Sequence, residues 1–447
     1  MTIVDKPDER PIRWHMDEAR NHAIEFFRKL IDNNSGIEKA VLIEDIFGWL
    51  RAVIWLKKKG NKEALSEEIN AELKDKASPY WSEEIFYSIN EDDPGYIFYQ
   101  TAWDEGVQDD KCKMLRIADR YRSRGSWFHA EIEPPWEVGA NKPPILVFYS
   151  FKGGVGRSTA LAAFAIQRAR MGEKIAVIDF DLYAPGVGVL LAADEHGTTA
   201  PWGALDYMLE RPHGRFLLDD YLHVCRREKV TGGGEIFVFP AAQVDDRYLS
   251  KLSRMDFEPP ATDEEKHPMI LLLEQIREEI NPSWLLIDSR AGLSEPAGFL
   301  LGGLAHLYVL FGTTSEQSWQ GIRLIIKHLG GQRVIQNRPQ LDCLLVQAMV
   351  TSDKEAAESA IKRFIDRSEE EFRNFYYAPN PDNADEDSFW YIRDIDDIES
   401  PHYPLAIHYH QSLAHFDLID KVADDLNEQD YKALVERIAR KFGKSEN

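Results

Sequence analysis

The chain has 447 residues, a formal net charge of −23 and 44% hydrophobic residues. This length predicts two or three folded domains, and the composition excludes a disordered chain. The negative charge argues against broad binding to DNA, which depends on neutralising phosphates. A local basic patch at Arg116, Arg120, Arg122 and Arg124 is compatible with that charge, although these residues better suit a solvated or ion-paired helix face.

The first and the most apolar segments predict a cytoplasmic protein that does not use a membrane. The chain begins MTIVDKPDERPIRW, without the apolar run of a signal peptide. Its apolar stretches are shorter than the roughly 18 residues of a membrane span. Cys112, Cys225 and Cys343 are far apart and match no zinc or disulfide spacing, so a reducing cytosol is the expected compartment.

Residues 1–132 are predicted to form an all-helical accessory or interaction domain. Apolar residues recur at helical spacing within residues 19–30, 41–54 and 65–73. Together with Pro144, which follows it, the segment 133–143 contains two Pro-Pro pairs. Such pairs cannot continue a helix. We therefore expect a Pro-rich linker there.

Residues 144–447 alternate strand-like apolar runs with helical patterns, which predicts a doubly wound, mostly parallel α/β sheet covered on both faces. The expected strands are 145–151, 174–180, 236–240, 284–288, 306–311, 341–350 and about 390–395. The expected helices lie near 157–171, 264–280, 316–329 and 354–374. Ligands of such sheets bind at the carboxyl ends of the strands, where Asp179, Asp181 and Asp288 all fall.

The sequence ILVFYSFKGGVGRST at residues 145–159 has the layout of a phosphate-binding loop between a strand and a helix. Its glycines allow the backbone to curl around phosphate oxygens. The Ser158 hydroxyl can bind Mg²⁺, and the Thr159 hydroxyl can reach an inner phosphate. The residues expected to bind the nucleotide are Lys152, Gly153, Gly154, Val155, Gly156, Arg157, Ser158 and Thr159.

Three carboxylates at strand ends are candidates for holding the metal ion and for orienting a water molecule. Asp288 ends the run WLLID, where it can hold Mg²⁺ through water opposite Ser158. Asp179 and Asp181 end the run IAVIDFD, and Asp179 is a further possible Mg²⁺ site through water. A carboxylate here can orient a water for attack on a phosphate. Each aspartate could instead simply cap the following turn.

The pattern K-G-G-x-G-[KR]-[ST]-T, with Lys152 before the glycines, resembles the deviant Walker A motif of the ParA/MinD-like ATPases. The segment DSRAG from Asp288 resembles the Walker B and switch II of that family, in a variant with GR in place of GK. The resemblance implies an ATP-dependent homodimer in which Lys152 reaches the nucleotide of the second subunit. It also implies that Asp181 positions the attacking water.

The resemblance implies a Mg·ATP-dependent dimerisation switch with slow hydrolysis that controls a protein partner in a bacterial signalling or defence system. Arg157 replaces the family's lysine and is not interchangeable with it. The alternative is therefore a nucleotide-loaded regulatory scaffold with little or no hydrolysis. A tyrosine kinase is disfavoured because the tail has only Tyr431, and a metal-cluster carrier because the sequence has no C-x-x-C.

Two further segments carry smaller expectations. Gln347 stands where relatives often place an Asn that reads adenine, and a buried core glutamine is an equal alternative. The segment YKALVERIARKFGK, residues 431–444, predicts a basic amphipathic helix. Its apolar face is short, so we expect it to dock on its own domain rather than on a membrane.

Overall fold

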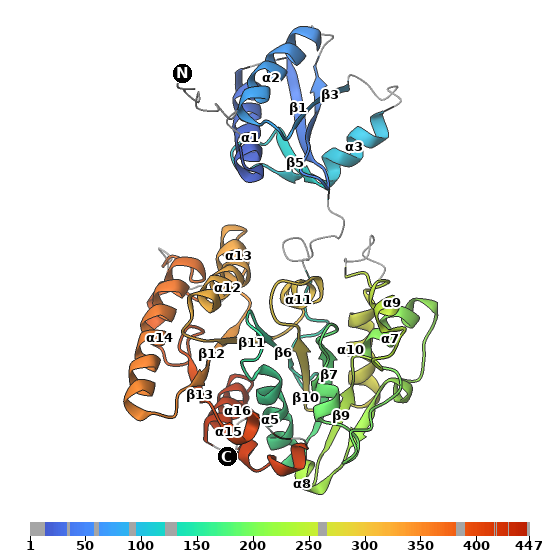
Figure 1. The fold of residues 1–447 in the computed structure, drawn as a ribbon, viewed down its shortest axis with the longest axis vertical. Coiled ribbons are helices and arrows are strands. Elements are labelled where there is room, and N and C mark those ends of the chain that lie inside the picture. Colours follow the sequence, from blue (N-terminus) through green and yellow to red (C-terminus); the bar gives the residue numbers. More distant parts are fainter. Residues whose placement is uncertain are drawn as a thin grey trace, which may run out of the picture. The chain divides into compact units, whose positions relative to one another are not determined.

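The computed structural model describes residues 14–33, 36–57, 62–88, 95–120, 132–257, 266–380, 389–414, 416, 418–427 and 429–444. It divides the chain into two compact units, Met1–Arg124 and Gly125–Asn447 (Figure 1). Among the described residues, no helix is long and apolar enough to cross a membrane.

The first unit is an α/β domain, so the prediction of an all-helical domain is wrong. Its five-stranded sheet has the order β3-β2-β1-β5-β4. The strands are β1 (Ile37–Glu44), β2 (Leu50–Leu56), β3 (Trp81–Ser88), β4 (Val107–Gln108) and β5 (Leu115–Asp119). The helices are α1 (Met16–Asn33), α2 (Lys62–Lys76) and α3 (Tyr96–Glu105).

The misleading signal was the apolar run that now forms β1 and β2. Leu42 and Ile54 pack in a cluster with α1 and α2, whereas Val41 and Val53 pack in a second cluster with Ala102 of α3. A strand that is buried on both faces is apolar at nearly every position, so its sequence has no clear period of two. The helical spacing read from residues 41–54 was a coincidence within this run.

The basic stretch does not form a helix face where it is described. Arg116 lies on β5, and its Nη1 donates to the carbonyl oxygen of Trp103 at 2.8 Å. Arg120 forms an ion pair with Glu105. Arg122 and Arg124 lie outside the described residues.

The second unit contains an eight-stranded sheet in the order β13-β12-β11-β6-β10-β7-β9-β8. All neighbours pair in parallel except the edge pair β8 and β9. The strands are β6 (Ile145–Ser150), β7 (Lys174–Phe180), β8 (His223–Cys225), β9 (Glu235–Phe239), β10 (Trp284–Ser289), β11 (Leu307–Gly312), β12 (Cys343–Val350) and β13 (Leu405–His408). This confirms the predicted doubly wound, mostly parallel sheet.

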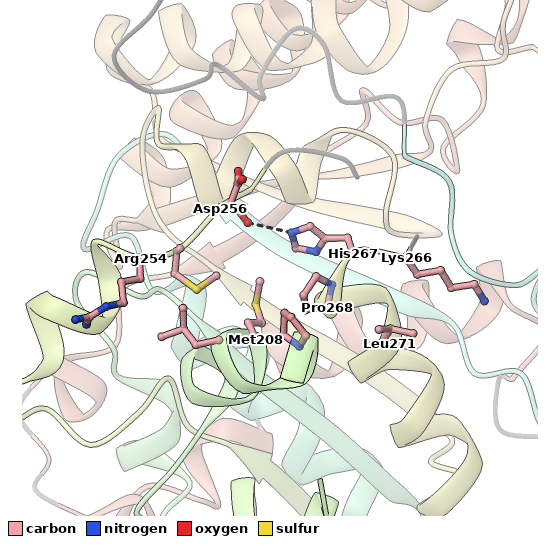
Figure 2. Close-up of a pocket in the computed structure, with 10 residues that line it drawn as sticks. Met208, Arg254, Asp256, Lys266, His267, Pro268 and Leu271 are labelled. Carbon is pink, nitrogen blue, oxygen red and sulfur yellow. Dashed lines mark hydrogen bonds between the residues drawn. The ribbon is translucent and has the colours of Figure 1, made fainter. Parts of the chain in front are cut away.

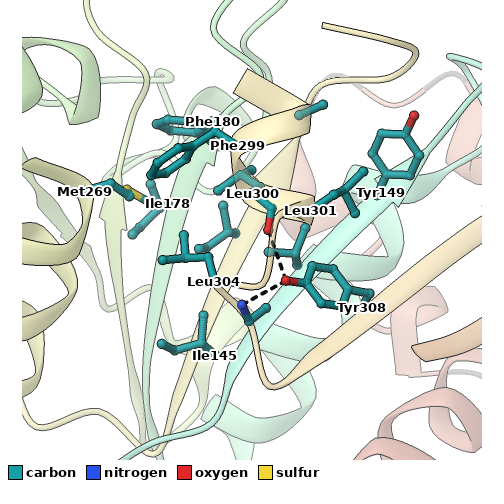
Figure 3. Packing of buried hydrophobic residues seen from close by; sticks show 14 of the residues in the cluster. Ile145, Tyr149, Ile178, Phe180, Met269, Phe299, Leu300, Leu301, Leu304 and Tyr308 are labelled. Atoms are coloured by element: carbon teal, nitrogen blue, oxygen red, sulfur yellow. Dashed lines mark hydrogen bonds between the residues drawn. The ribbon is translucent and has the colours of Figure 1, made fainter. Parts of the chain in front are cut away.

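Helices cover both faces of this sheet. Their bounds are α5 (Arg157–Arg170), α6 (Val187–Leu190), α7 (Ala204–Glu210), α8 (Glu228–Thr231), α9 (Tyr248–Leu252), α10 (Pro268–Glu279), α11 (Glu295–Leu301), α12 (Glu316–Ile326), α13 (Gln332–Ile335), α14 (Lys354–Phe375), α15 (Gln411–Ala414) and α16 (Gln429–Lys441). Leu146 and Phe148 of β6 pack with α5 and α16, whereas Ile145, Val147 and Tyr149 pack with α7, α10, α11, α12 and α14. Figure 3 shows part of the cluster that contains Ile145 and Tyr149, where Tyr149 and Tyr308 lie near Leu300, Leu301 and Leu304.

Two predictions at the carboxyl end of the chain had different outcomes. The strand expected at about 390–395 is wrong, because Ile392–Asp396 forms a 3₁₀ turn and the last strand is β13. The docked terminal helix is confirmed, since Leu434 and Ile438 of α16 are fully buried in the core with α5.

The segment expected to be a linker is part of the second unit where it is described. Trp136 is 6% exposed and belongs to the main core cluster together with Ile132. Its Nε1 donates to the Pro143 carbonyl oxygen at 2.8 Å, and its own carbonyl oxygen lies 2.7 Å from Nε2 of His306. Prolines end the helix pattern here, but they do not prevent the segment from packing.

The cysteines lie in the interiors of the two units. Cys112 belongs to the first unit, and Cys225 and Cys343 belong to the second. All three are free thiols with buried side chains.

Candidate nucleotide-binding site

The glycine-rich loop joins β6 to α5 at the carboxyl end of the central strand, as the sequence predicted. Gly154 and Gly156 have φ angles of 72° and 80°, in the left-handed region that favours glycine. A Cβ at either position would meet no heavy atom within 4 Å. The requirement for glycine is therefore one of backbone conformation, and it shapes a loop whose N–H groups lead into the first turn of α5.

Ser158, Asp288 and Arg157 converge beside this loop. The Ser158 hydroxyl donates to Oδ2 of Asp288 at 2.6 Å, and Nε of Arg157 donates to Oδ1 of the same carboxylate at 2.6 Å. Nη2 of Arg157 lies 3.1 Å from Oδ2 of Asp181. The arginine thus turns inward to the aspartates, and its side chain is only 8% exposed.

Asp179 and Asp181 shape the loop that follows β7. Oδ2 of Asp179 accepts from the backbone N–H groups of Gly186 at 2.9 Å and Gly188 at 3.0 Å. Asp179 pairs directly with Asp288 across the adjacent parallel strands. Asp181 lies farther out, and its Oδ1 accepts from the Ala184 N–H at 3.3 Å. Asp179 therefore closes the loop, while Asp181 lies at the margin of the cavity.

Burial and crowded negative charge affect the ionisation of the inner pair. Burial, followed by the charge of Asp288, raises the pKa of Asp179 to about 7, although the N–H groups of Gly188 and Gly186 oppose this. Burial also raises the pKa of Asp288, while Arg157 and Ser158 act in the opposite direction. The inward-facing arginine is thus the cation that balances these carboxylates.

Lys152 lies at the start of the loop with an exposed side chain. It forms no ion pair with any residue in the part of the chain that the structure describes. A lysine so placed is available to a ligand or to a second chain. This position is compatible with the role that the resemblance implies, and its contact with nucleotide stays a prediction.

Two cavities flank the loop and share Gly154, Val155, Gly156 and Thr159. The first has a volume of about 400 Å³, and its other lining residues include Ser158, Asp181 and Arg290. The second has a volume of about 350 Å³, and its lining is completed by Met349, Ile407, His408, Tyr409, His410, Leu413, Ala414 and Tyr431. The first is polar enough for phosphates, and the second offers the apolar and aromatic surface that suits a base.

Gln347 is buried in β12 and does not line either cavity. Its Oε1 has no hydrogen-bond partner among the described residues. Two residues later, Met349 has a φ angle of 60° at a bulge between β12 and β13, and it lines the second cavity. A non-glycine residue in this conformation is strained, and such strain often accompanies a binding site.

Sequence reasoning missed several residues at the site. Arg290 lines the first cavity, and Met349 and His408–His410 line the second. Arg290 could have been found, because it is a charged residue two positions after a buried strand's aspartate. Met349 could not, because its place depends on the bulge and on a strand that was predicted elsewhere.

A separate cavity of about 530 Å³ lies between α7 and the start of α10 (Figure 2). His267 lies in it with its Nε2 3.2 Å from the Asp256 carbonyl oxygen, and its Nδ1 accepts from the Met269 N–H. This cavity shares no residue with the two at the loop.

The strand order, the glycine loop and the paired Ser158 and Asp288 define a P-loop NTPase domain. Residues 142–209 match the family model described as ParA: NUBPL iron-transfer P-loop NTPase. This segment, which holds the loop, α5, Asp179 and Asp181, is a ParA-type P-loop NTPase segment, as the sequence indicated.

Curated relatives match only around this segment. An iron–sulfur cluster carrier protein of Salmonella typhimurium is 37% identical over 59 residues, which cover 13% of this chain and 16% of the relative. A protein of the same description from Pseudomonas fragi is 41% identical over 56 residues, or 12% of this chain and 20% of the relative. The chain therefore spans less than a quarter of the length of these relatives.

Two solved structures also align with this chain. A structure of pNOB8 ParA bound to nonspecific DNA aligns with 67% of this chain and 99% of its own, with 14% identity and a TM-score of 0.43. The MinC:MinD cell division protein complex of Aquifex aeolicus aligns with 68% of this chain and 98% of its own, with 17% identity and a TM-score of 0.39.

Proposed function

We propose that the protein is a Mg·ATP-dependent dimerisation switch with slow hydrolysis that controls a protein partner. The observation that carries the proposal is the contact of 2.6 Å between the Ser158 hydroxyl and the Asp288 carboxylate, beside a loop of exposed backbone N–H groups. Oxygen donors in this arrangement suit Mg²⁺. When bound there, the ion would neutralise charge on the phosphates.

The remaining residues have roles that follow from their positions. The N–H groups from Gly153 to Thr159 would bind phosphate oxygens at the start of α5. Asp181 lies at the margin of the phosphate cavity, where its carboxylate would orient the attacking water. Asp179 would hold the loop that carries Asp181, through Gly186 and Gly188. The cavity beside Met349 and Tyr409 would hold the base.

Exposed apolar side chains support the proposal that the protein forms a dimer and binds a protein partner. Tyr183, Val189, Val244 and Leu293 are more than half exposed on segments that follow β7, β9 and β10, on the same side as Lys152. Exposed apolar residues at one edge are typical of an interface. In the first unit, the β1–β2 turn exposes Phe47, which gives a protein partner an apolar contact.

The second candidate is a nucleotide-loaded scaffold with little hydrolysis. It is favoured by the inward position of Arg157. The guanidinium binds Asp288 and Asp181 instead of extending toward a phosphate. The guanidinium bridges these two carboxylates, and its contact with Asp181 must rearrange if Asp181 is to orient a water. The two candidates differ in turnover, not in nucleotide binding.

Calorimetry with Mg·ATP on the wild-type chain and a Ser158→Ala, Asp288→Ala double variant tests nucleotide binding. We expect the double variant to lose most of its Mg²⁺-dependent affinity. Equal affinity in both proteins would contradict the site. Light scattering with ATP then tests dimerisation, and phosphate release over hours separates slow hydrolysis from a scaffold that retains its nucleotide.

A further inference from the structure

We propose that Arg290 is a second phosphate-binding arginine, which distinguishes a nucleoside triphosphate from a diphosphate by binding the terminal phosphate. The inference rests on the proposed function, because it assigns a role within the same nucleotide site. Arg290 lines the phosphate cavity, and its side chain is 34% exposed. It is therefore partly covered but still open to a ligand.

The backbone on both sides of Arg290 is fixed. Asp288, two residues earlier, pairs in the sheet with Phe148 of β6 and Asp179 of β7. Gly292, two residues later, donates its N–H to the Ser150 carbonyl oxygen at 3.0 Å and accepts from the Tyr149 hydroxyl at 3.2 Å. A short segment held at both ends directs its side chain reproducibly into the cavity, as a specificity residue requires.

The arrangement of the two cavities sets which phosphate Arg290 would meet. The cavities share Gly154, Val155, Gly156 and Thr159 and lie on either side of this part of the loop. With the base beside Met349 and Tyr409, the phosphates cross the loop and the terminal one enters the cavity that Asp181 and Arg290 line. A diphosphate bound in the same way would end nearer the loop.

The contacts that Arg290 makes in this structure are weak ones. Its guanidinium lies 4.2 Å from the ring centre of Tyr183, and Nη1 lies 3.9 Å from Oδ1 of Asp181. An exposed cation–π contact is weaker than a charge-assisted, bidentate bond to phosphate. Arg157, by contrast, is buried and bound to Asp288 at 2.6 Å. Arg290 is thus the arginine of this cavity that a phosphate can recruit at low cost.

Moving Arg290 to the phosphate would also release Tyr183. Tyr183 lies two residues after Asp181, in the loop that Asp179 closes, and its side chain is 52% exposed. Arg290, on the segment after β10, therefore contacts the loop after β7 at both Tyr183 and Asp181. Triphosphate binding would change the surroundings of Tyr183 at the exposed edge, whereas diphosphate binding would not.

The test is calorimetry on the full chain with Mg²⁺ and either ADP or the β,γ-imido analogue of ATP. For Arg290→Gln, we expect analogue affinity to fall roughly tenfold or more, the loss of one charge-assisted hydrogen bond, with ADP affinity changed by less than about twofold. Arg290→Lys keeps a point charge without the planar fork and should show a smaller fall. The matched control is Arg277→Gln, which removes an arginine that stacks on Trp136 away from this cavity.

The ratio of analogue affinity to ADP affinity decides the outcome. An unchanged ratio in Arg290→Gln overturns the inference, including the case in which both affinities fall together because the arginine only supports the loop. If Arg290→Gln fails to fold, an unchanged ratio in Arg290→Lys overturns it instead. Wild-type protein that binds neither nucleotide would overturn the proposed function as well. Tight binding of both, with no effect of Arg290, would overturn this inference alone.

Discussion

Arg157 and Asp288 form a buried ion pair in which Nε lies 2.6 Å from Oδ1, with side chains 8% and 1% exposed. The same guanidinium reaches Asp181, and Asp179 lies on the strand next to Asp288. Arg157 therefore supplies a positive charge at the place where the sequence predicts a metal ion.

Removing this arginine should make the fold depend on magnesium. Arg157→Ala leaves buried carboxylates without their cation, which should cost about 3–5 kcal/mol of unfolding free energy. Mg²⁺ should restore part of the loss, because it returns positive charge to Asp288. Chemical unfolding with and without Mg²⁺ measures both effects.

The matched control for that experiment is Arg168→Ala. Arg168 is also a buried arginine of α5 and forms an ion pair with Glu173 at 2.6 Å. Its loss should destabilise the fold without creating any response to Mg²⁺. An equal response in the two variants would contradict the assignment of a metal site beside Asp288.

Mixing two inactive variants should test whether Lys152 acts across a dimer. Asp181→Ala should bind ATP and accumulate as a dimer, and Lys152→Ala should bind ATP but turn over far more slowly. In the mixed dimer, the site that keeps Asp181 faces the partner with an intact Lys152. We expect this site to regain ATPase activity if the lysine acts in trans.

The readout for the mixture is phosphate release after mixed dimers have been confirmed by light scattering and affinity tags. Activity that neither parent variant has would support the trans arrangement. Mixed dimers without recovered activity would instead place the lysine on its own subunit's nucleotide.

The segment before β6 should contribute to the stability of the second unit. Trp136 is 6% exposed, and Trp136→Ala should cost about 3–5 kcal/mol of unfolding free energy, as for other buried aromatic residues. Trp202, which is 47% exposed, is the control, and its replacement by alanine should cost much less. Denaturant melts of both variants make the comparison. A similar small effect at both positions would mean that residues 133–143 behave as a linker.

His402 should make the fold sensitive to acid. Burial lowers the pKa of His402 to about 4 from an ordinary value of 6.5. Between these values the unfolded chain binds a proton that the folded chain does not, so stability should fall as the pH drops from 6.5 towards 4.

The variant His402→Gln should flatten this dependence, because it removes the titrating ring and leaves an acceptor for the Tyr377 hydroxyl, which lies 2.8 Å from Nδ1. His196→Gln, at an exposed position, should leave the dependence as it is. The measurement is the urea midpoint of unfolding across this pH range. Midpoints that depend on pH in the same way in wild type and His402→Gln would contradict the prediction.

The sequence was a good guide where one local pattern determines the structure. The loop from Lys152 to Thr159 needs glycines at particular positions, and the run that ends at Asp288 is apolar because its strand is buried on both faces. Those signals were enough to predict the central strands, the glycine loop and the positions of three aspartates. The inward turn of Arg157 was not predictable, since it depends on distances between residues from three strand ends.

The same pattern failed in the first unit for a physical reason. Consecutive apolar residues such as Val41 and Leu42 occur both in a buried helix and in a strand that is covered on both faces. Only the pairing of β1 with β2 and β5 distinguishes the two, and pairing is a property of distant segments. The helices α1 and α2, each with one apolar face, were predicted correctly.

The burial of all three cysteines has a practical consequence for following nucleotide binding in solution. Thiol reagents such as maleimides should react slowly with the folded wild-type chain, because thiol chemistry requires access to the sulfur. A single cysteine introduced at Leu293, whose side chain is 55% exposed just after Gly292, would then be the fast-reacting thiol of the protein. A fluorophore attached there would report nucleotide binding at the neighbouring loop, with little labelling of the three native cysteines.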